Sequence, residues 1–538
     1  IRPFLLPKME GTLIYECLGC GRHHAIGELL YTCPDCHQVL LLKDLDVDRL
    51  KHISGTLWHR IFDYRKMLNV PALQGIYRFH EFIGPMIPLD AIVYLGEGHT
   101  PMVAANALLA GEAGGPFYFK NDGQNPSASF KDRGMASALS YLNSLVRSGG
   151  ISDVLAVCAS TGDTSAAAAL YGSYLQPHVK SAVLLPHKKV TPQQLSQPLG
   201  SGAAVFEIPG VFDDCMKVVE ALSEQYPVAL LNSKNAWRIL GQESYSYEIA
   251  QDFEYDLHSK AVVVPIGNAG NITAVMNGFI KFFNAGIITE LPKIVGVQSC
   301  HANPVYRYYS ESDPDKRQFV PVNVKSSVAQ AAMIGNPVSM PRVVHLENRY
   351  NDLSEKQNVF FVEVDEQSIM DWQLTANRNG HIACTHGGEC LAGLVQARRR
   401  GMIARDEVAI IDSTAHALKF SGFQDLYFEN KFPDEFNIRP NTDLINTPVL
   451  VRPADLEKVP SPGNPLEGGD LQRFVQRVSE EIARALSLKK EGQQHGDDEE
   501  HADVPDDPNI PQLHVAECNA AQSCQCEHPR NDHRPSNP

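Results

Sequence analysis

The chain has 538 residues, more than a single hydrophobic core usually organises, so two or more domains are expected. Its formal net charge of −16 argues against a nucleic-acid partner, which would require a basic face. No apolar run approaches the roughly 20 residues that span a bilayer, and the proline-broken start does not match a secretory signal. We therefore expect a cytoplasmic protein that binds neither nucleic acid nor membrane.

Four of the twelve cysteines form two Cys-x-x-Cys pairs near the N-terminus. The first motif contains Cys17 and Cys20, and the second contains Cys33 and Cys36. Two such motifs at this spacing let four thiolates converge tetrahedrally on zinc. The alternative is a set of free thiols in a reducing compartment. Residues 1–45 are therefore predicted to form a zinc-ribbon-like unit. Because four cysteines would fill the coordination sphere, the zinc is expected to be structural rather than catalytic.

Short apolar segments alternate with longer helical patterns between about residues 90 and 425. The segments expected to be buried strands are residues 117–119, 154–159, 182–185, 205–208, 229–231, 261–264, 294–297, 360–364 and 408–411. Ala-rich or amphipathic stretches such as 165–175 and 212–225 separate them. This alternation predicts a doubly wound α/β architecture with mostly parallel sheets. Ligands of such folds gather at the carboxyl ends of the strands.

The pattern weakens after residue 430. Residues 431–488 are predicted to form a C-terminal extension with one amphipathic helix. The apolar positions of that helix are Leu471, Phe474, Val475, Val478, Ile482 and Leu486. Residues 489–538 are acidic and poor in apolar residues, so a disordered tail is expected there.

Lys131 occupies a distinctive place in the sequence. It stands in the run Asn-Pro-Ser-Ala-Ser-Phe-Lys-Asp-Arg-Gly at residues 125–134, after a short apolar strand and at the start of an Ala-rich helix. The positive potential of a helix start lowers the pKa of a nearby amine, which suits a lysine that forms a Schiff base. An ordinary exposed lysine is the alternative.

A glycine-rich turn follows the predicted strand at residues 261–264. Its residues are Gly267, Asn268, Ala269, Gly270 and Asn271, and a helical pattern follows at once. Backbone amides in such a turn form an anion cradle at a helix N-terminus. A tight strand-to-helix connection would also need glycine, so the turn alone is weak evidence.

The Lys131 run closely resembles the lysine motif of pyridoxal-phosphate (PLP) enzymes of the tryptophan-synthase-β class, also called fold type II, and most of all that of threonine synthases. The resemblance covers roughly residues 90–425. It implies two doubly wound α/β domains, the smaller at about residues 130–240 inserted in a catalytic body of residues 46–430. It further implies that Lys131 holds PLP, that residues 267–271 bind its phosphate, and that a homodimer is possible.

A second loop, after the predicted strand at residues 154–159, matches the family segment that contacts the cofactor ring and the substrate carboxylate. By this match Ser160, Thr161 and Thr164 are substrate ligands. Many relatives carry Asn where Asp163 stands, and that Asn hydrogen-bonds the phenolate oxygen of the cofactor. An ionised Asp163 would repel the phenolate, so it must be protonated, turned away or compensated by another charge.

A third loop, at residues 412–419, resembles the family segment Thr-Gly-His-Gly-Leu-Lys. By this match Thr414 hydrogen-bonds the pyridine nitrogen of PLP, with Ser413 as a second candidate. A hydroxyl at this place does not hold the ring protonated, which weakens the electron sink and discourages transamination. Ala415 and Ala417 replace both glycines of the family segment, which puts the backbone path of the loop in question.

Residues near 232–242 resemble the threonine-synthase segment that holds the substrate phosphate. Asn232, Ser233 and Arg238 are the implied ligands, and Lys120 matches a further phosphate-contacting lysine. A guanidinium and amide donors near a helix start suit a dianion. An ordinary helix cap and a solvated arginine would explain the same residues.

The resemblance implies conversion of O-phospho-L-homoserine and water to L-threonine and phosphate. Three alternatives remain at this point. A PLP-dependent threonine or serine dehydratase would need no clamp like Arg238. A β-replacement enzyme similar to a cysteate synthase would keep the clamp and use phosphoserine. A non-catalytic regulator with the same fold is the third.

Overall fold

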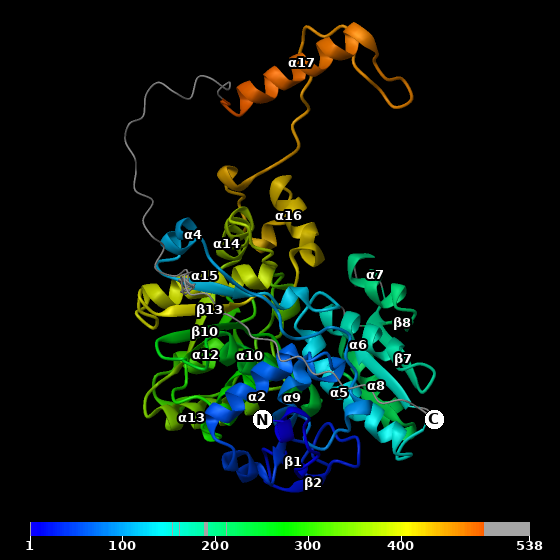
Figure 1. Ribbon diagram of the computed structural model, residues 1–538, viewed down its shortest axis with the longest axis vertical. Helices are drawn as coiled ribbons and strands as arrows, with labels where there is room; N and C mark the ends of the chain where they lie inside the picture. The colour runs from blue at the N-terminus through cyan, green and yellow to red at the C-terminus, as the bar shows by residue number, and fades with distance from the viewer. Residues whose placement is uncertain (1, 153, 161, 188–191, 211, 489–538) are drawn as a thin grey trace, which may run out of the picture. The chain divides into compact units, whose positions relative to one another are not determined.

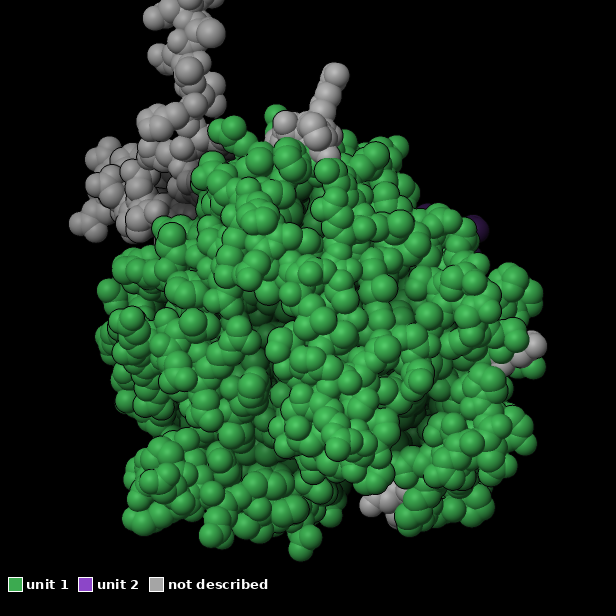
Figure 2. All heavy atoms as spheres, turned by 90° about the horizontal axis from the view of Figure 1, so that it is seen from below, with its two compact units in different colours: residues 1–447 green, residues 448–538 purple. Residues whose placement is uncertain are grey.

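The computed structural model describes residues 2–152, 154–160, 162–187, 192–210 and 212–488 (Figure 1). The chain divides into two compact units, residues 1–447 and 448–538, which Figure 2 colours separately. The predicted tail at residues 489–538 lies outside the described residues. The domain boundaries expected at residues 45 and 430 stay predictions.

The first unit begins with a small antiparallel sheet. Its strands are β1 (Leu13–Cys17), β2 (His23–Ala25) and β3 (Leu40–Asp44), in the order β2-β1-β3. This sheet corresponds to the predicted N-terminal unit. In Figure 1 it lies beside helix α9 (Ala236–Gln242), which contacts β3.

The larger of the two remaining sheets has six strands in the order β12-β11-β10-β13-β5-β4. All neighbours are parallel except β4 and β5. The strands are β4 (Met102–Ala104), β5 (Phe117–Lys120), β10 (Lys260–Pro265), β11 (Lys293–Ser299), β12 (Val359–Val364) and β13 (Val408–Asp412). Every strand predicted for this sheet is confirmed, and β4 adds an edge that the sequence pattern did not indicate.

Successive residues of the central strand β10 face two different hydrophobic cores. Val262 and Val264 pack into one core, and Ala261 and Val263 pack into the other. The two-residue period of a strand puts alternate side chains on opposite faces, so a strand buried on both faces is apolar throughout. Helices α10 (Ser244–Asp252), α11 (Gly270–Asn284) and α13 (Met340–Ser354) contribute to the first core, and α14 (Glu366–Arg378) and α15 (Thr385–Arg399) to the second.

The smaller parallel sheet has the order β8-β7-β6-β9. Its strands are β6 (Val154–Ala159), β7 (Val179–Pro186), β8 (Ala204–Ile208) and β9 (Val228–Leu230). Helices α6 (Asp163–Tyr174), α7 (Pro192–Gly200) and α8 (Phe212–Gln225) alternate with these strands along the chain. The two doubly wound α/β parts expected from the sequence are therefore present.

The other helices are short or peripheral. They are α1 (Arg2–Leu5), α2 (Gly55–Met67), α3 (His80–Ile83), α4 (Ala107–Glu112), α12 (Pro304–Ser310), α16 (Ser421–Phe428) and, in the second unit, α17 (Gly468–Ala485). Helix α17 confirms the predicted amphipathic helix. Among the described residues, no helix combines the length and apolarity needed to cross a membrane.

Two glycines bring together the helices that precede and follow the smaller sheet. A Cβ atom on Gly241 of α9 would lie 2.2 Å from the carbonyl oxygen of Arg133 in helix α5 (Lys131–Arg147). A Cβ atom on Gly134 of α5 would lie 2.9 Å from the carbonyl oxygen of Arg238. Only glycine permits this close approach of the two backbones. The contact places the residues around Lys131 beside those around Arg238.

A methyl group at this contact should separate the two helices. We expect Gly241→Ala to lower the free energy of unfolding by about 1–3 kcal/mol, the usual cost of overpacking a buried site. The matched control is Gly422→Ala in α16, where an added Cβ meets no atom within 4 Å and where alanine favours the helix. Urea denaturation of the two variants measures both effects, and equal midpoints would contradict the expectation.

Candidate active site

Lys131 is the first residue of α5, and its side chain is half-buried. Its Nζ atom is 4.1 Å from the centre of the Phe130 ring. Burial, followed by the positive charge of Arg238, lowers the pKa of the Lys131 ammonium to about 7. At neutral pH a large fraction of this amine is therefore uncharged and nucleophilic.

The charged groups that act on Lys131 come from three separate predicted loops. Besides Arg238 on α9, they include Asp163 at the start of α6 and Asp412 at the end of β13. Cys158, near the end of β6, is a further neighbour. The fold thus gathers the loops at the carboxyl ends of strands from both sheets around one amine, as expected for this class of α/β architecture.

Backbone hydrogen bonds join the Lys131 run to the loop that follows β13. The amide of Phe130 donates to the carbonyl of Thr414 at 2.8 Å, and the amide of His416 donates to that of Ala128 at 3.1 Å. Neither Ala415 nor Ala417, both within the described chain, adopts a positive φ. Alanine therefore fits the backbone path where the family segment has glycine. The side chains of Ser413 and Thr414 are both buried, so both remain candidates for the pyridine nitrogen.

The glycine-rich turn lies between β10 and α11, as predicted. Ala269 has φ of +62°, which lies in the left-handed region that residues other than glycine rarely adopt. The carbonyl of Asn268 accepts a hydrogen bond from Ser339 at 3.1 Å. Asn271 donates its side-chain amide to Asp412 at 2.6 Å. The turn, which includes Gly267 and Gly270, is thus fixed to the end of β13.

Asp163 is buried and has a counter-charge. Its carboxylate lies 2.9 Å from the ammonium of Lys419, which also donates to the carbonyl of Ser127 at 2.8 Å. Of the three possibilities that the sequence left for Asp163, this contact supports compensation by another charge. In the same loop Ser160 accepts a hydrogen bond from Gly162, and Thr161 lies outside the described residues.

Thr164 is half-buried in the first turn of α6, next to Asp163. It lies at the start of a helix that follows strand β6, and its role as a substrate ligand stays a prediction.

Arg238 is almost fully buried, and no carboxylate pairs with it among the described residues. Its Nη1 atom donates to the carbonyl of Leu231 at 3.2 Å, while its Nε atom has no partner in the described structure. Burial lowers the pKa of this guanidinium to about 10. A buried cation without an anion is costly, and a bound anion would relieve that cost.

Asn232 and Ser233 precede α9 in a turn beside Arg238. The Asn232 side chain accepts a hydrogen bond from the amide of Lys234 at 2.9 Å, so part of its role is to shape the turn. Asn235 caps α9 by accepting from the amide of Trp237 at 2.9 Å. The ordinary helix cap considered from the sequence is therefore Asn235.

Lys120 is placed differently from the other predicted phosphate ligands. Its ammonium is buried and contacts the carbonyl of Thr100 at 2.7 Å, Asp252 at 2.8 Å and Glu248 at 3.1 Å. An ammonium has three donors, and these three acceptors can satisfy all of them. This arrangement favours a structural role for Lys120 over contact with substrate.

Several buried polar atoms around Lys131 have no hydrogen-bond partner in the described structure. They are Oγ of Ser129, Oδ1 of Asp412, Oγ of Ser413 and Nε of Arg238. Buried polar groups are normally satisfied, so a cluster of exceptions points to a polar ligand. The donor set of an amine, hydroxyls and backbone amides fits a cofactor that carries an aldehyde, a ring nitrogen and a phosphate.

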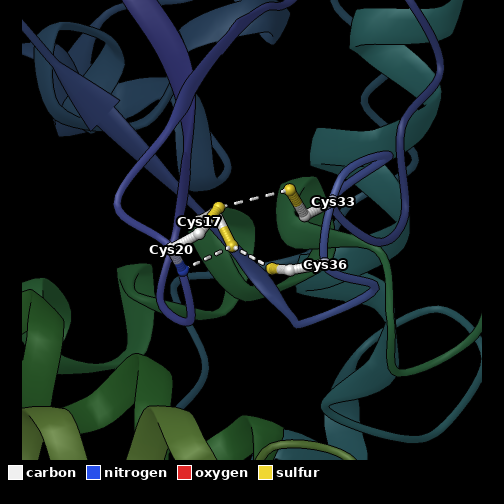
Figure 3. A group of neighbouring side chains, drawn as sticks. All are labelled: Cys17, Cys20, Cys33 and Cys36. Carbon is white, nitrogen blue, oxygen red and sulfur yellow. Dashed lines mark hydrogen bonds between the residues drawn. The ribbon is translucent and has the colours of Figure 1, made fainter.

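The four N-terminal cysteines converge as predicted (Figure 3). Cys17 and Cys36 have their sulfur atoms 3.3 Å apart, and the sulfurs of Cys20 and Cys33 are 3.7 Å apart. Tetrahedral zinc with Zn–S bonds of about 2.3 Å requires sulfurs roughly 3.8 Å apart. The cluster therefore has dimensions suited to one tetrahedral ion.

Two charged residues of the site were not singled out from the sequence. Lys419 is the last residue of the loop segment that resembles the family, but the neighbouring sequence does not indicate that it pairs with Asp163. Asp412 follows a predicted strand, where ligand contacts concentrate, and this position was the available signal. Both assignments depend on which strands are neighbours in the folded chain.

Comparison with known proteins agrees with this geometry. Residues 93–413 match the model of the family described as pyridoxal-phosphate dependent enzymes, so the chain belongs to this class. A threonine synthase of Methanocaldococcus jannaschii is 33% identical over 76% of this chain and 93% of its own length. Threonine synthase 2, chloroplastic, of Arabidopsis thaliana is 34% identical over 80% of each chain. Within its class, the chain belongs to the threonine synthase family.

A solved structure shows the same fold. The crystal structure of threonine synthase from Escherichia coli superimposes with a TM-score of 0.58, at 19% sequence identity, over 79% of this chain and 94% of that chain. At this identity the likeness concerns the fold. It confirms the fold type II architecture that was expected from the Lys131 run.

The lowered pKa of Lys131 has a measurable consequence for cofactor capture. Only the neutral amine attacks the aldehyde of PLP, so the capture rate of cofactor-free protein should rise with pH through a midpoint near 7. An unperturbed lysine would give a midpoint near 10.4. Stopped-flow absorbance measures the rate, and Lys131→Ala should show no covalent capture. A midpoint above pH 9 would contradict the prediction.

The contact between Lys419 and Asp163 should stabilise the holoenzyme. We expect Lys419→Met to lower the free energy of unfolding by about 1–3 kcal/mol, because it leaves the Asp163 carboxylate buried without its partner. Adding Asp163→Asn should restore much of the loss. Lys431→Met, which removes an exposed pair with Glu429, is the matched control. Full stability of Lys419→Met would count against the compensating role.

Proposed function

We propose that this protein is a PLP-dependent threonine synthase, which converts O-phospho-L-homoserine and water to L-threonine and phosphate. The observation that carries the proposal is the buried guanidinium of Arg238, which lacks an anionic partner among the described residues and acts on Lys131. It supplies a place for a substrate phosphate next to the reactive amine. The threonine synthases that match most of the chain support the same reaction.

The residues of the site fit PLP. Lys131 would hold its aldehyde, the amides of Gly267–Asn271 its phosphate, and Thr414 or Ser413 its ring nitrogen. When bound, PLP would supply an electron sink that stabilises negative charge on the reacting carbons of the substrate. Asp163, paired with Lys419, would lie at the phenolate side of the ring, where the lysine charge offsets that of the carboxylate.

The chain's own residues would bind the substrate and move its protons. Lys131, with a pKa of about 7, is suited both to remove the Cα proton and to return one. A Cβ proton would also leave and phosphate would depart from Cγ. Water would supply a hydroxyl to Cβ and its remaining proton to the phosphate, and Cγ and Cα would take up protons again. We assign Asn232, Ser233 and Arg238 to the phosphate, whose charge they would hold as it leaves.

The substrate carboxylate is assigned to the loop between β6 and α6. Ser160 and Thr164 supply hydroxyls there, and Thr161 completes the predicted set. The start of α6 adds backbone amides and the positive end of a helix dipole. Lys120, whose donors are already satisfied, is left out of this assignment.

We further infer that the cluster of Cys17, Cys20, Cys33 and Cys36 holds a structural zinc ion. The distances between the sulfurs support a tetrahedral site, and four thiolates leave no open position for catalysis. A homodimer and a location in the cytoplasm stay predictions from the sequence.

The first experiment is a phosphate-release assay on the holoenzyme. O-phospho-L-homoserine, O-phospho-L-serine and L-threonine are compared as substrates, and the products are identified by mass. Threonine and phosphate in equal amounts from phosphohomoserine alone are expected. Activity on threonine would indicate a dehydratase, and activity on phosphoserine with a sulfur nucleophile would indicate the β-replacement enzyme. No turnover of any substrate by PLP-loaded protein would support the non-catalytic regulator.

Removing the positive charge of Arg238 should weaken binding of the substrate and leave binding of PLP unchanged. We expect Arg238→Met to lower kcat/KM for phosphohomoserine by about 10²-fold or more, since a charge-assisted contact contributes about 1.5–3 kcal/mol and several donors act together. Arg238→Lys keeps the charge but loses the planar fork, so it should recover only part of the activity. Absorbance of bound PLP should be unchanged, and loss of PLP would assign Arg238 to the cofactor.

A further inference from the structure

The segment from β9 to α9, which carries the proposed phosphate ligands, makes three sets of contacts that link it to the N-terminal unit with the four cysteines. Tyr31 makes the first link. Its hydroxyl donates to the carbonyl of Val228 at 3.3 Å and accepts from the amide of Leu230 at 2.9 Å. Strand β9 is an edge strand, and these two main-chain groups lie on its unpaired side. Tyr31 thus occupies the place that a neighbouring strand would take.

Trp237 makes the second link, one residue before Arg238. Its indole nitrogen donates to the hydroxyl of Tyr15 at 3.0 Å, and both side chains are buried. The indole also stacks on Tyr141, with ring centres 3.9 Å apart. Tyr15 therefore fixes the orientation of the helix turn from which Arg238 projects.

Arg342 makes the third link. It is fully buried, and it donates to the carbonyl of Leu40 in β3 at 2.6 Å and to those of Ser233 and Lys234 at 3.2 and 3.1 Å. Burial lowers the pKa of this guanidinium to about 9. The contacts join the N-terminal sheet directly to the turn that contains Asn232.

The cysteines and the two tyrosines are coupled through the backbone. Tyr15 lies two residues before Cys17 in β1, so the two side chains share one face of the strand. Tyr31 lies two residues before Cys33. Fixing the four sulfurs around one ion therefore fixes the two hydroxyls that hold β9 and α9.

We propose that the four-cysteine unit, with its metal ion bound, positions the phosphate-binding segment, and that metal binding thereby sets the affinity for the substrate phosphate. The inference rests on the proposed function of Asn232, Ser233 and Arg238. It assigns Tyr31, Trp237 and Arg342 as positioning residues. Tyr141, which contacts Trp237 and Ile26, lies farther along α5 than Lys131. The start of α5 is held chiefly by Arg133, which pairs with Asp122 and Glu248, so the chemical step should not depend on the metal to the same degree.

The coupling is reciprocal, which gives a test without turnover. If the metal strengthens phosphate binding, inorganic phosphate must strengthen metal binding by the same factor. Competition with a chelator measures the zinc affinity of the holoenzyme with and without inorganic phosphate. We expect phosphate to raise it about two- to tenfold, the range that one or two positioned hydrogen bonds provide. In Arg238→Met the effect should disappear, which controls for binding of phosphate to zinc in solution.

Tyr31→Phe tests the path itself. In the zinc-loaded variant, we expect KM for phosphohomoserine to rise about two- to tenfold. The Kd for inorganic phosphate, measured by calorimetry, should rise by a similar factor. Its kcat and the absorbance of bound PLP should be unchanged. Tyr64→Phe, which alters a tyrosine that is 46% exposed, should change none of these values.

Equal zinc affinity with and without phosphate, together with unchanged KM in Tyr31→Phe, would overturn the inference. A fall in kcat or in PLP content at constant KM would overturn it too, because it would show a merely structural unit. If Tyr31→Phe does not fold, the phosphate effect on wild-type zinc affinity decides alone. Failure of the proposed function would give a different result. Phosphate would still raise the zinc affinity of the holoenzyme, but the holoenzyme would not turn over phosphohomoserine.

Discussion

The candidate active site depends on one buried arginine that has no carboxylate partner among the described residues. Arg133 and Arg238 lie on adjacent helices, and both are buried. Arg133 contacts both oxygens of Asp122 and of Glu248 at 2.8 Å, and these carboxylates raise its pKa. Arg238 has no such pair among the described residues, and burial lowers its pKa. One arginine therefore completes the fold, and the other is available to an anionic ligand.

The same charge arrangement acts on the reactive amine. Lys131 feels Arg238 as its main charged neighbour, and burial and this neighbour together keep part of the amine neutral near pH 7. A dianionic phosphate bound at Arg238 would offset that positive charge and so raise the pKa of the amine. Substrate binding would then make Lys131 a stronger base while the substrate is present. The proximity that Gly134 and Gly241 permit would connect the proposed phosphate binding to the proposed proton transfer.

The sequence predicted the parts of the fold that depend on local pattern. Strands such as β6 and β13 are short, apolar and bounded by turn residues, so burial on both faces made them recognisable. Lys131 was found because its neighbours form a local run. The contact of Lys419 with Asp163 and the burial of Lys120 were not predicted, because each joins segments far apart in the chain. Charge pairing of this kind is decided by strand order, which no local spacing encodes.

In the proposed function, the N-terminal unit would take part in substrate recognition without supplying a reacting group. The segment from β9 to α9 is short and lies at the edge of its sheet, where one side lacks a neighbouring strand. The hydroxyl of Tyr31 takes the place of that neighbour by accepting from the amide of Leu230. The hydroxyl of Tyr15, which accepts from Trp237, and three carbonyl contacts of Arg342 hold the rest of the segment. A phosphate clamp needs rigid donors, because each loose donor costs binding energy when it is ordered. A metal ion held by the four thiolates, as we propose, would give rigidity to a unit too small for a large core of its own, and these hydrogen bonds would transmit that rigidity to the proposed phosphate clamp.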